Sequence, residues 1–143
     1  MEHLRRLTSN WDVDKTIALE EKKLVIIRFG TDWDHQCMQV DDMLAKVEYD
    51  LSNFADIYLV EITEVTGFNE LYELHDPCTI MFFFRNKHIK VDFGTGNNNK
   101  INWVINNKQD FIDVVEEIYR GVAKGKNLII SPINFGKKIT SFN

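Results

Sequence analysis

The chain has few of the residues that mark disulfide-rich or non-globular proteins: two cysteines, two prolines and seven glycines in 143 residues. So few cysteines exclude a small scaffold held together by disulfides. So little proline and glycine argue against low-complexity sequence and long disordered linkers. Long hydrophobic runs are missing too, because a run such as Ile80–Phe84 matches a buried strand and not a membrane span. We therefore expect a globular domain with no membrane partner.

The N-terminal segment lacks the apolar stretch of a secretion signal. Met1–Leu7 is too polar for a signal peptide. We therefore expect a reducing compartment, cytosolic or nuclear. Hydrophobic residues make up 44% and charged residues 27% of the chain, which is long enough to bury a sizeable core. One domain over residues 1–143 is expected.

Acidic residues are absent from the last part of the chain. From Tyr119 to Asn143 there are five basic residues and no Asp or Glu, although the whole chain has a net charge of −5. The remainder carries 12 basic and 22 acidic residues, a balance of −10. A basic tail on an acidic body can contact RNA or an acidic protein surface, and it can equally be a solvated extension. We expect a basic C-terminal extension from about residue 124.

Motifs for phosphate binding and hydrolysis are also missing. The sequence has no Walker-type glycine-rich loop, no His-Glu-x-x-His and no Gly-x-Ser-x-Gly. We therefore predict no catalytic residues and no cofactor. Two histidines and two cysteines that converge in space could bind zinc, as His35, Cys37, His75 and Cys78 would, but their spacings are not those of a typical zinc module, and we predict no metal site.

Apolar periodicity predicts alternating helices and strands. In order, we expect a helix from a cap at Asp12 or Asp14 to about Glu21, a strand over 24–29, a helix starting at Asp34, a strand over 56–62, a short helix over 69–74, a hairpin of strands over 80–85 and 89–93, and a helix over 108–122. A strand-helix-strand unit gives a parallel pair, and the hairpin adds antiparallel strands. The prediction is an α/β fold with a mixed central sheet flanked by helices on both faces.

The segment Phe29–Cys37, Phe-Gly-Thr-Asp-Trp-Asp-His-Gln-Cys, resembles the active-site turn of thioredoxins, in which Trp-Cys-x-x-Cys ends a strand and opens a helix. Trp33 and Cys37 match that pattern, whereas Asp34 replaces the attacking cysteine. We interpret Asp34 as the N-cap of the helix. In thioredoxins a buried acidic residue used for proton transfer lies six positions before the first cysteine, where this chain has Arg28. Two parts of dithiol chemistry are therefore missing.

Cys37 lies on the apolar stripe of its helix, so we expect a buried and unreactive thiol. The resemblance to thioredoxins places Pro77 and Cys78 in a loop that packs over the turn. A disulfide between Cys37 and Cys78 is then feasible, although a reducing compartment need not preserve it. Pro77 is a candidate cis-proline, although Cys78 separates it from Thr79, where thioredoxins place proline directly before threonine. The alternative function is a thiol-disulfide oxidoreductase that uses the two cysteines.

A second unusual stretch, Asp92–Trp103, reads Asp-Phe-Gly-Thr-Gly-Asn-Asn-Asn-Lys-Ile-Asn-Trp. Glycine and asparagine tolerate positive φ, so we expect a compact loop after the last predicted strand. The asparagine side chains could bind RNA, bind the backbone of a partner, or stabilise the loop itself. The candidate contacts for a partner or RNA are Gly94, Thr95, Gly96, Asn97, Asn98, Asn99, Lys100, Asn102 and Trp103.

Four segments taken together closely resemble the Dim-type thioredoxin-like proteins of the spliceosomal U-five small nuclear ribonucleoprotein. They are LVIIRFGTDW at 24–33, DPCTIMFFFRNKH at 76–88, GTGNNNKINW at 94–103 and IYRG at 118–121. The resemblance runs over nearly the whole length, includes Leu128–Pro132, and fails at the extreme N-terminus and after Pro132. It implies one thioredoxin-like domain over residues 1–143.

The resemblance also implies a function. Such a protein is nuclear and non-enzymatic, is required for pre-mRNA splicing, and is a component of the U-four/U-six.U-five tri-snRNP and of the precatalytic spliceosome. The partners it implies are large spliceosomal proteins of the U-five snRNP and tri-snRNP, with RNA near the five-prime splice site close by. We therefore expect a splicing component, with a thiol-disulfide oxidoreductase as the alternative.

Overall fold

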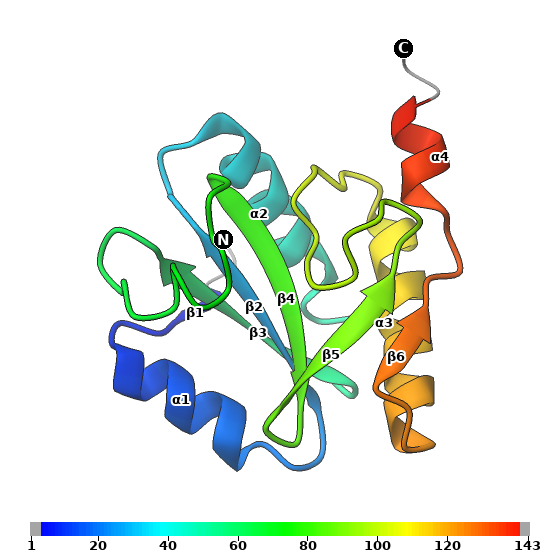
Figure 1. Cartoon of the computed structure of the whole chain (residues 1–143), viewed down its shortest axis with the longest axis horizontal. Helices are drawn as coiled ribbons and strands as arrows, with labels where there is room; N and C mark the ends of the chain where they lie inside the picture. The colour runs from blue at the N-terminus through cyan, green and yellow to red at the C-terminus, as the bar shows by residue number, and fades with distance from the viewer. Residues whose placement is uncertain (1–3, 141–143) are drawn as a thin grey trace.

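A twisted sheet of six strands runs through the computed structural model, which describes residues 4–140 without the side chains of 138–140 (Figure 1). Residues 1–3 and 141–143 of the predicted domain, and the side chain of Lys138 in the predicted basic extension, lie outside the described residues. The elements in chain order are β1 (Arg5–Arg6), α1 (Asn10–Leu19), β2 (Leu24–Gly30), α2 (His35–Val47), β3 (Ala55–Glu61), β4 (Cys78–Phe84), β5 (Lys87–Asp92), α3 (Lys108–Ala123), β6 (Leu128–Ile130) and α4 (Phe135–Thr140).

The sheet is mixed, as predicted. Its strand order is β1-β3-β2-β4-β5-β6. The central strand β2 pairs in parallel with β3, through the crossover helix α2, and antiparallel with β4. Strands β4 and β5 form the predicted hairpin, and β6 then pairs in parallel with β5. The thioredoxin-like α/β arrangement expected from the order of the elements is therefore present.

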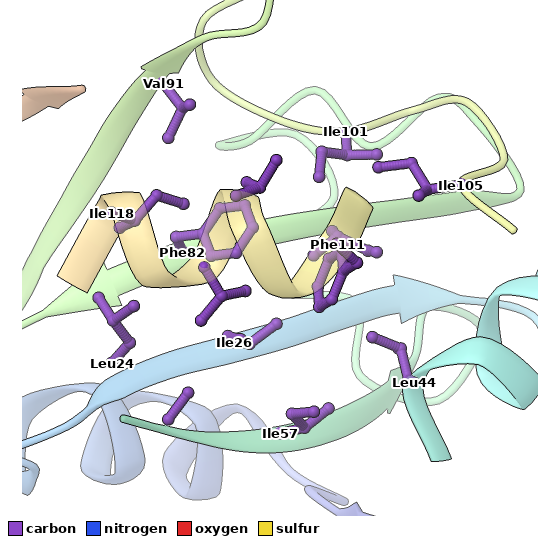
Figure 2. Packing of buried hydrophobic residues seen from close by; sticks show 14 of the residues in the cluster. Leu24, Ile26, Leu44, Ile57, Phe82, Val91, Ile101, Ile105, Phe111 and Ile118 are labelled. Atoms are coloured by element: carbon purple, nitrogen blue, oxygen red, sulfur yellow. The ribbon is translucent and has the colours of Figure 1, made fainter. Parts of the chain in front are cut away.

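Helices cover both faces of the sheet, and this explains why every residue of β2 is buried. Leu24 and Ile26 point to the face covered by α2 and α3, where Ile26 lies near Phe82 and Phe111 (Figure 2). The alternate residues Val25 and Ile27 point to the face covered by α1. Period-two alternation places successive side chains on opposite faces, so a strand buried on both sides reads as a continuous apolar run. None of the helices in residues 4–140 is long and apolar enough to cross a membrane.

Helix α1 starts earlier than the sequence suggested. Its N-cap is Ser9, whose Oγ accepts a hydrogen bond from the N–H of Asp12 at 3.0 Å. The prediction of a cap at Asp12 or Asp14 is wrong, because Asp12 lies in the first turn instead. There its carboxylate faces the positive end of the helix dipole, which is also a favourable position.

The short helix predicted over 69–74 does not form. The segment is a series of turns. The N–H of Tyr72 donates to the backbone carbonyl of Phe68 at 2.9 Å, and the N–H of Leu74 donates to the backbone carbonyl of Asn69 at 2.8 Å. Glu73 has a φ of 52°, a left-handed conformation that ends any helical run. Phe68 and Leu74 are nevertheless buried, so the turns cover part of the sheet face on the α1 side.

The C-terminal segment contributes to the sheet, which the sequence analysis did not predict. Ile129 of β6 is buried against α3 at Gly121, where a Cβ atom would lie 2.1 Å from Ile129 Cδ1. At the start of α4, Phe135 is buried and contacts the ring of Phe93. A Cβ atom at Gly136 would lie 1.9 Å from the carbonyl oxygen of Gly94, so α4 meets the backbone of the preceding loop closely. Residues 128–135 are therefore built into the fold.

A buried cation lies at the centre of this framework. Arg28 of β2 has no exposed surface, and its Nε and Nη2 donate to the two carboxylate oxygens of Asp41 on α2 at 2.7 and 2.6 Å. Its Nη1 donates to the carbonyl of Val60 on β3 at 3.1 Å, and Nη2 also reaches Asp32 at 2.8 Å. One guanidinium thereby joins β2, β3, α2 and the turn that precedes α2. Two-pronged arginine–carboxylate pairs combine strength with fixed geometry.

The surroundings keep Arg28 and Asp32 charged. Burial by itself would lower the pKa of Arg28, but the hydrogen bond and the charge of Asp41 outweigh it and raise that pKa above its usual range. Partial burial by itself would raise the pKa of Asp32, but hydrogen bonds from Arg28 and Arg6 lower it below its usual range. Arg28 and Asp32 are thus both ionised at neutral pH.

Removing the cation should destabilise the fold strongly. In Arg28→Ala the carboxylate of Asp41 is left partly buried without its partner, which should cost about 3–5 kcal/mol of unfolding free energy. In the double variant with Arg28→Met and Asp41→Leu the loss should be much smaller, because no charge is left unpaired. Urea denaturation measures both values.

The matched control is Asp42→Ala, which removes the exposed pair that Asp42 forms with Lys46 at 2.8 Å. Surface pairs contribute little, so this change should be small. If Arg28→Ala shifted the urea midpoint no more than Asp42→Ala does, the central role of Arg28 would be refuted.

Candidate functional site

The turn between β2 and α2 is fixed at both ends. Asp34 is the N-cap of α2, as predicted, and its Oδ2 accepts a hydrogen bond from the N–H of Cys37 at 3.0 Å. Its carboxylate therefore satisfies one of the free N–H groups at the helix start. On the other side, the N–H of Thr31 donates to the carbonyl of Pro77 at 3.1 Å, which ties the loop before β4 to the turn.

Apolar side chains are exposed around this turn. We define the turn surface as Trp33, Met38 and Pro77. The side chain of Trp33 is 69% exposed and that of Met38 is 48% exposed, and Pro77 is exposed as well. Large exposed apolar groups beside a rigid turn are suited to contact another protein.

The two thiols lie beneath the turn. Cys37 is fully buried and Cys78 is 9% exposed. Both are free cysteines, and a hydrogen bond joins their side chains. Gly30 covers the first thiol, since a Cβ atom there would lie 2.5 Å from Cys37 Sγ. The structure thus brings together the two cysteines named from the sequence, but as thiols without a bond between the sulfur atoms.

The two thiols differ in acidity. The hydrogen bond from Cys78, assisted by the charge of Arg28, lowers the pKa of Cys37, although burial opposes this. The same hydrogen bond, together with burial, raises the pKa of Cys78. Cys37 is therefore the more acidic thiol, yet it has no exposed surface at which to meet an external disulfide.

The prediction of a cis-proline at Pro77 is wrong. No peptide bond among residues 4–140 is cis. The physical reason lies in the inserted residue: Cys78 starts β4 and pairs with Gly30, so Pro77 precedes the strand. From there its carbonyl accepts the hydrogen bond from Thr31 in the trans form.

The four residues weighed as zinc ligands do not gather. His35 and His75 are exposed, whereas Cys37 and Cys78 are buried. Across residues 4–140, no group of three or more His, Cys, Asp or Glu residues is placed to hold a metal ion.

The stretch Asp92–Trp103, which we call the asparagine-rich loop, forms one wall of a pocket of about 570 Å³. The opposite wall is the turn segment that replaces the predicted short helix. An antiparallel bridge holds the loop in place, in which the N–H groups of Ile80 and Ile101 donate to each other's carbonyls at 2.8 and 2.9 Å. The residues that line the pocket are Leu71, Tyr72, Glu73, His75, Asp76, Met81, His88, Gly96, Asn97, Asn98, Asn99, Lys100 and Asn102.

Lys100 has a structural role that the sequence did not indicate: its side chain forms hydrogen bonds inside the fold. It is only 7% exposed, and its Nζ donates to the carbonyls of Tyr72 at 2.7 Å and Glu73 at 2.5 Å. This buried ammonium joins the asparagine-rich loop to the facing turns. The prediction that Lys100 contacts RNA or a partner is therefore not supported, because its charge is satisfied inside the protein.

Other residues of the loop are used within the fold as well. Trp103 is half-buried between the rings of Phe93 and Phe135, at 5.2 and 5.4 Å between ring centroids. The side chain of Asn102 donates to Asp76 at 3.1 Å across the pocket. Trp103 therefore packs against the fold, whereas Asn102 remains exposed at the pocket.

The tip of the loop is partly self-bonded. Gly94 donates its N–H to the side chain of Asp92 at 2.9 Å, and the hydroxyl of Thr95 accepts from the N–H of Asn97 at 3.3 Å. The side chain of Asn97 accepts from the N–H of Asn99 at 2.9 Å. Gly94 and Gly96 adopt φ of 81° and 88°, as expected for a loop of this composition.

Two amide side chains at the tip remain available for a ligand. Those of Asn98 and Asn99 have no hydrogen-bond partner among the described residues, and Asn99 is exposed. The backbone carbonyl of Asn99 accepts from His88 Nε2 at 2.8 Å. Burial lowers the pKa of His88, although this hydrogen bond opposes it, so the ring is neutral at pH 7. The tip thus offers neutral amide groups.

Sequence reasoning missed the far wall of the pocket. Tyr72, His75, Met81 and His88 are brought to the loop by the bridge at Ile101 and by the buried Lys100. These links are long-range, and no local spacing in the sequence indicates them.

Comparison with solved structures agrees with the fold. Chloroplastic thioredoxin z superposes with a TM-score of 0.67 at 14% sequence identity, covering 85% of this chain and 98% of that structure. Thioredoxin of Fasciola hepatica superposes with a TM-score of 0.63 at 13% identity, covering 79% and 97%. At such low identity the likeness shows the thioredoxin fold alone.

Comparison with protein sequences identifies the family. The family described as "Mitosis protein DIM1" matches residues 3–135. The chain is 51% identical over 135 residues to the mitosis protein dim1 of Schizosaccharomyces pombe, covering 94% of this chain and 95% of that protein. It is 49% identical over 138 residues to the spliceosomal protein DIB1 of Saccharomyces cerevisiae, covering 96% of each. The chain therefore belongs to the DIM1 family of thioredoxin-fold proteins.

Proposed function

We propose that this protein is a non-catalytic component of the spliceosome that is required for pre-mRNA splicing. The observation that carries the proposal is the near-full-length identity of 49% to a protein named for the spliceosome, the DIB1 protein of yeast. A protein with this function works in the nucleus, and we assign it to the U-four/U-six.U-five tri-snRNP and to the precatalytic spliceosome.

The geometry of the turn supports a non-enzymatic role. A dithiol oxidoreductase needs an accessible thiolate that attacks a substrate disulfide. Here Asp34 occupies the position of the attacking thiol and caps α2. Cys37 is fully buried beneath Gly30. Arg28 replaces the acidic residue of thioredoxins and donates hydrogen bonds to Asp41, Asp32 and the carbonyl of Val60.

Two surfaces are suited to contact partners. The turn surface offers exposed apolar side chains on a rigid support, which suits large spliceosomal proteins of the U-five snRNP and tri-snRNP. The tip of the asparagine-rich loop offers neutral amides at Asn98 and Asn99, which can bond the base edges or sugars of RNA near the five-prime splice site. Both roles are part of the proposal.

The protein should not catalyse disulfide reduction. Purified protein is assayed for thiol-dependent reduction of a protein disulfide with dithiothreitol as the electron source, and its rate should equal the background. Cys37→Ser and Cys78→Ser should leave that rate unchanged, because the parent has no accessible thiolate. Thiol-dependent turnover in the parent that either serine variant abolishes would revive the oxidoreductase function.

Splicing should depend on the turn surface. In nuclear extract depleted of this protein, tri-snRNP particles should be reduced, and adding back the parent should restore splicing of a reporter pre-mRNA. Trp33→Ala should restore splicing several-fold less well, because it removes the largest exposed anchor. The control is Trp11→Ala on α1, where the side chain is similarly exposed at 66%, and it should behave as the parent.

Two outcomes would contradict the proposal at different levels. Intact tri-snRNP and normal splicing after complete depletion would contradict the function itself. Equal rescue by Trp33→Ala and the parent would leave the function in place and remove the turn surface from it.

A further inference from the structure

Strand β6 is an edge of the sheet, and no other strand lies beyond it in residues 4–140 (Figure 1). Among the described residues it pairs only with β5, in the register Lys90 with Leu128 and Asp92 with Ile130. Helix α3 packs on one face of β6, through Ile129 and Gly121. Edge strands present unpaired backbone groups that can pair with another chain.

The register shows which backbone groups of β6 point outward. The N–H of Lys90 donates to the carbonyl of Asn127 at 3.1 Å, and the N–H of Ser131 donates to the carbonyl of Asp92 at 2.9 Å. Residues 127, 129 and 131 therefore direct their backbone groups toward β5. Because successive strand residues alternate in direction, the N–H and C=O groups of Leu128 and Ile130 point away from β5, toward the open edge.

The side chains of the same two residues are exposed. Leu128 is 49% exposed and Ile130 is 71% exposed, on the face opposite α3. On that face β5 presents Lys90 beside Leu128 and Asp92 beside Ile130, both exposed. An apolar edge strand of this kind offers both unpaired hydrogen-bonding groups and apolar surface to a partner.

Basic residues surround the start of β6. A pocket of about 180 Å³ opens beside Asn127 and is lined by Arg85, Lys87 and Lys126 among its charged residues, with no acidic residue in its lining. Lys90 adds another positive charge on the exposed face of β5, beside Leu128. The sequence from residue 119 to the end has no Asp or Glu, in a protein whose remaining residues are acidic overall. The edge is therefore positively charged where the strand begins.

We propose that β6 is a docking edge for an extended segment of a protein partner, in which alternating apolar residues are flanked by acidic ones. The segment adds a strand to the sheet through the outward backbone groups of Leu128 and Ile130. Its apolar side chains cover those of the same two residues, and its acidic side chains meet Lys90 and the basic pocket. Three residues of β6 give a short ladder, so the interaction is weak and depends on charge complementarity.

The test uses the full chain and a synthetic peptide, Glu-Glu-Ser-Val-Thr-Ile-Ser-Glu, labelled with fluorescein. Fluorescence anisotropy should give a dissociation constant of about 10 to 100 µM, as expected for a small interface. Amide hydrogen exchange followed by NMR should slow at Leu128 and Ile130 when the unlabelled peptide is added. A second peptide, in which every Glu is Lys, should bind at least tenfold more weakly.

Backbone pairing is tested with Ile130→Pro, which removes one outward N–H and leaves the ladder to β5 intact. It should weaken peptide binding at least tenfold, whereas Ile130→Ala keeps that N–H and should weaken it about threefold. Lys90→Glu tests the charge and should also weaken binding at least tenfold. Its control, Lys15→Glu on α1, should leave binding unchanged, because Lys15 lies on another element.

Urea midpoints identify any variant that does not fold. If Ile130→Pro does not fold, the proposal is tested by amide exchange at Leu128 and Ile130 of the parent and by peptide binding to Lys90→Glu. Exchange that slows away from β6, equal binding of the lysine peptide, or undiminished binding by folded Ile130→Pro would each overturn the proposal. So would dimers of the parent that Ile130→Pro abolishes, because the occupant would then be a second copy of the chain. None of these outcomes bears on whether depleted extract loses splicing.

Discussion

The buried pair of Arg28 and Asp41 is the interaction on which the rest of the structure depends. A guanidinium with no exposed surface in the middle of the central strand needs partners for its nitrogen atoms, and each of the three has one, supplied by α2, β3 and the turn. The same set of bonds therefore fixes the position of α2 relative to the sheet. Where thioredoxins place an acid that moves protons, this chain places a permanent cation that cannot release its proton at physiological pH. The turn above it is accordingly a rigid surface, which supports the non-enzymatic role that we propose.

A second buried cation acts in the same way at another place. The ammonium of Lys100 bonds two carbonyls of the turn segment at Tyr72 and Glu73, and so holds the asparagine-rich loop against that segment. The pocket between them exists because this link keeps two irregular segments at a fixed separation. In both places a side chain that would ordinarily be solvated is used to position exposed groups nearby, Trp33 in one case and Asn99 in the other. Hydrogen bonds of the buried side chains of Arg28 and Lys100 thus hold in place the two surfaces proposed to contact partners.

The sequence predicts well what local chemistry decides. The apolar run at Leu24 indicates a doubly buried strand, and the position of Asp34 before an amphipathic helix indicates its cap. It predicts poorly what distant segments decide. Nothing near Lys100 reveals that carbonyls 27 and 28 residues away accept its hydrogen bonds, and nothing near Arg28 reveals Asp41 as its partner. Strand β6 has only three residues, so no alternation can be recognised before its pairing with β5 is known. The predicted helix over 69–74 failed because the left-handed residue Glu73 is selected by the contacts of the folded chain and not by its own propensity.

The close contact between Gly136 and the backbone of Gly94 has a consequence for synthesis of the chain. Strand β5 gains its second neighbouring strand, and Phe93 and Trp103 gain the ring of Phe135, from residues 128–135. On the ribosome residues 128–135 emerge after strands β1 to β5, which have then had time to collapse. Until residues 128–135 have been synthesised, β5 is therefore an open edge of the sheet, and the rings of Phe93 and Trp103 lack the contact with Phe135.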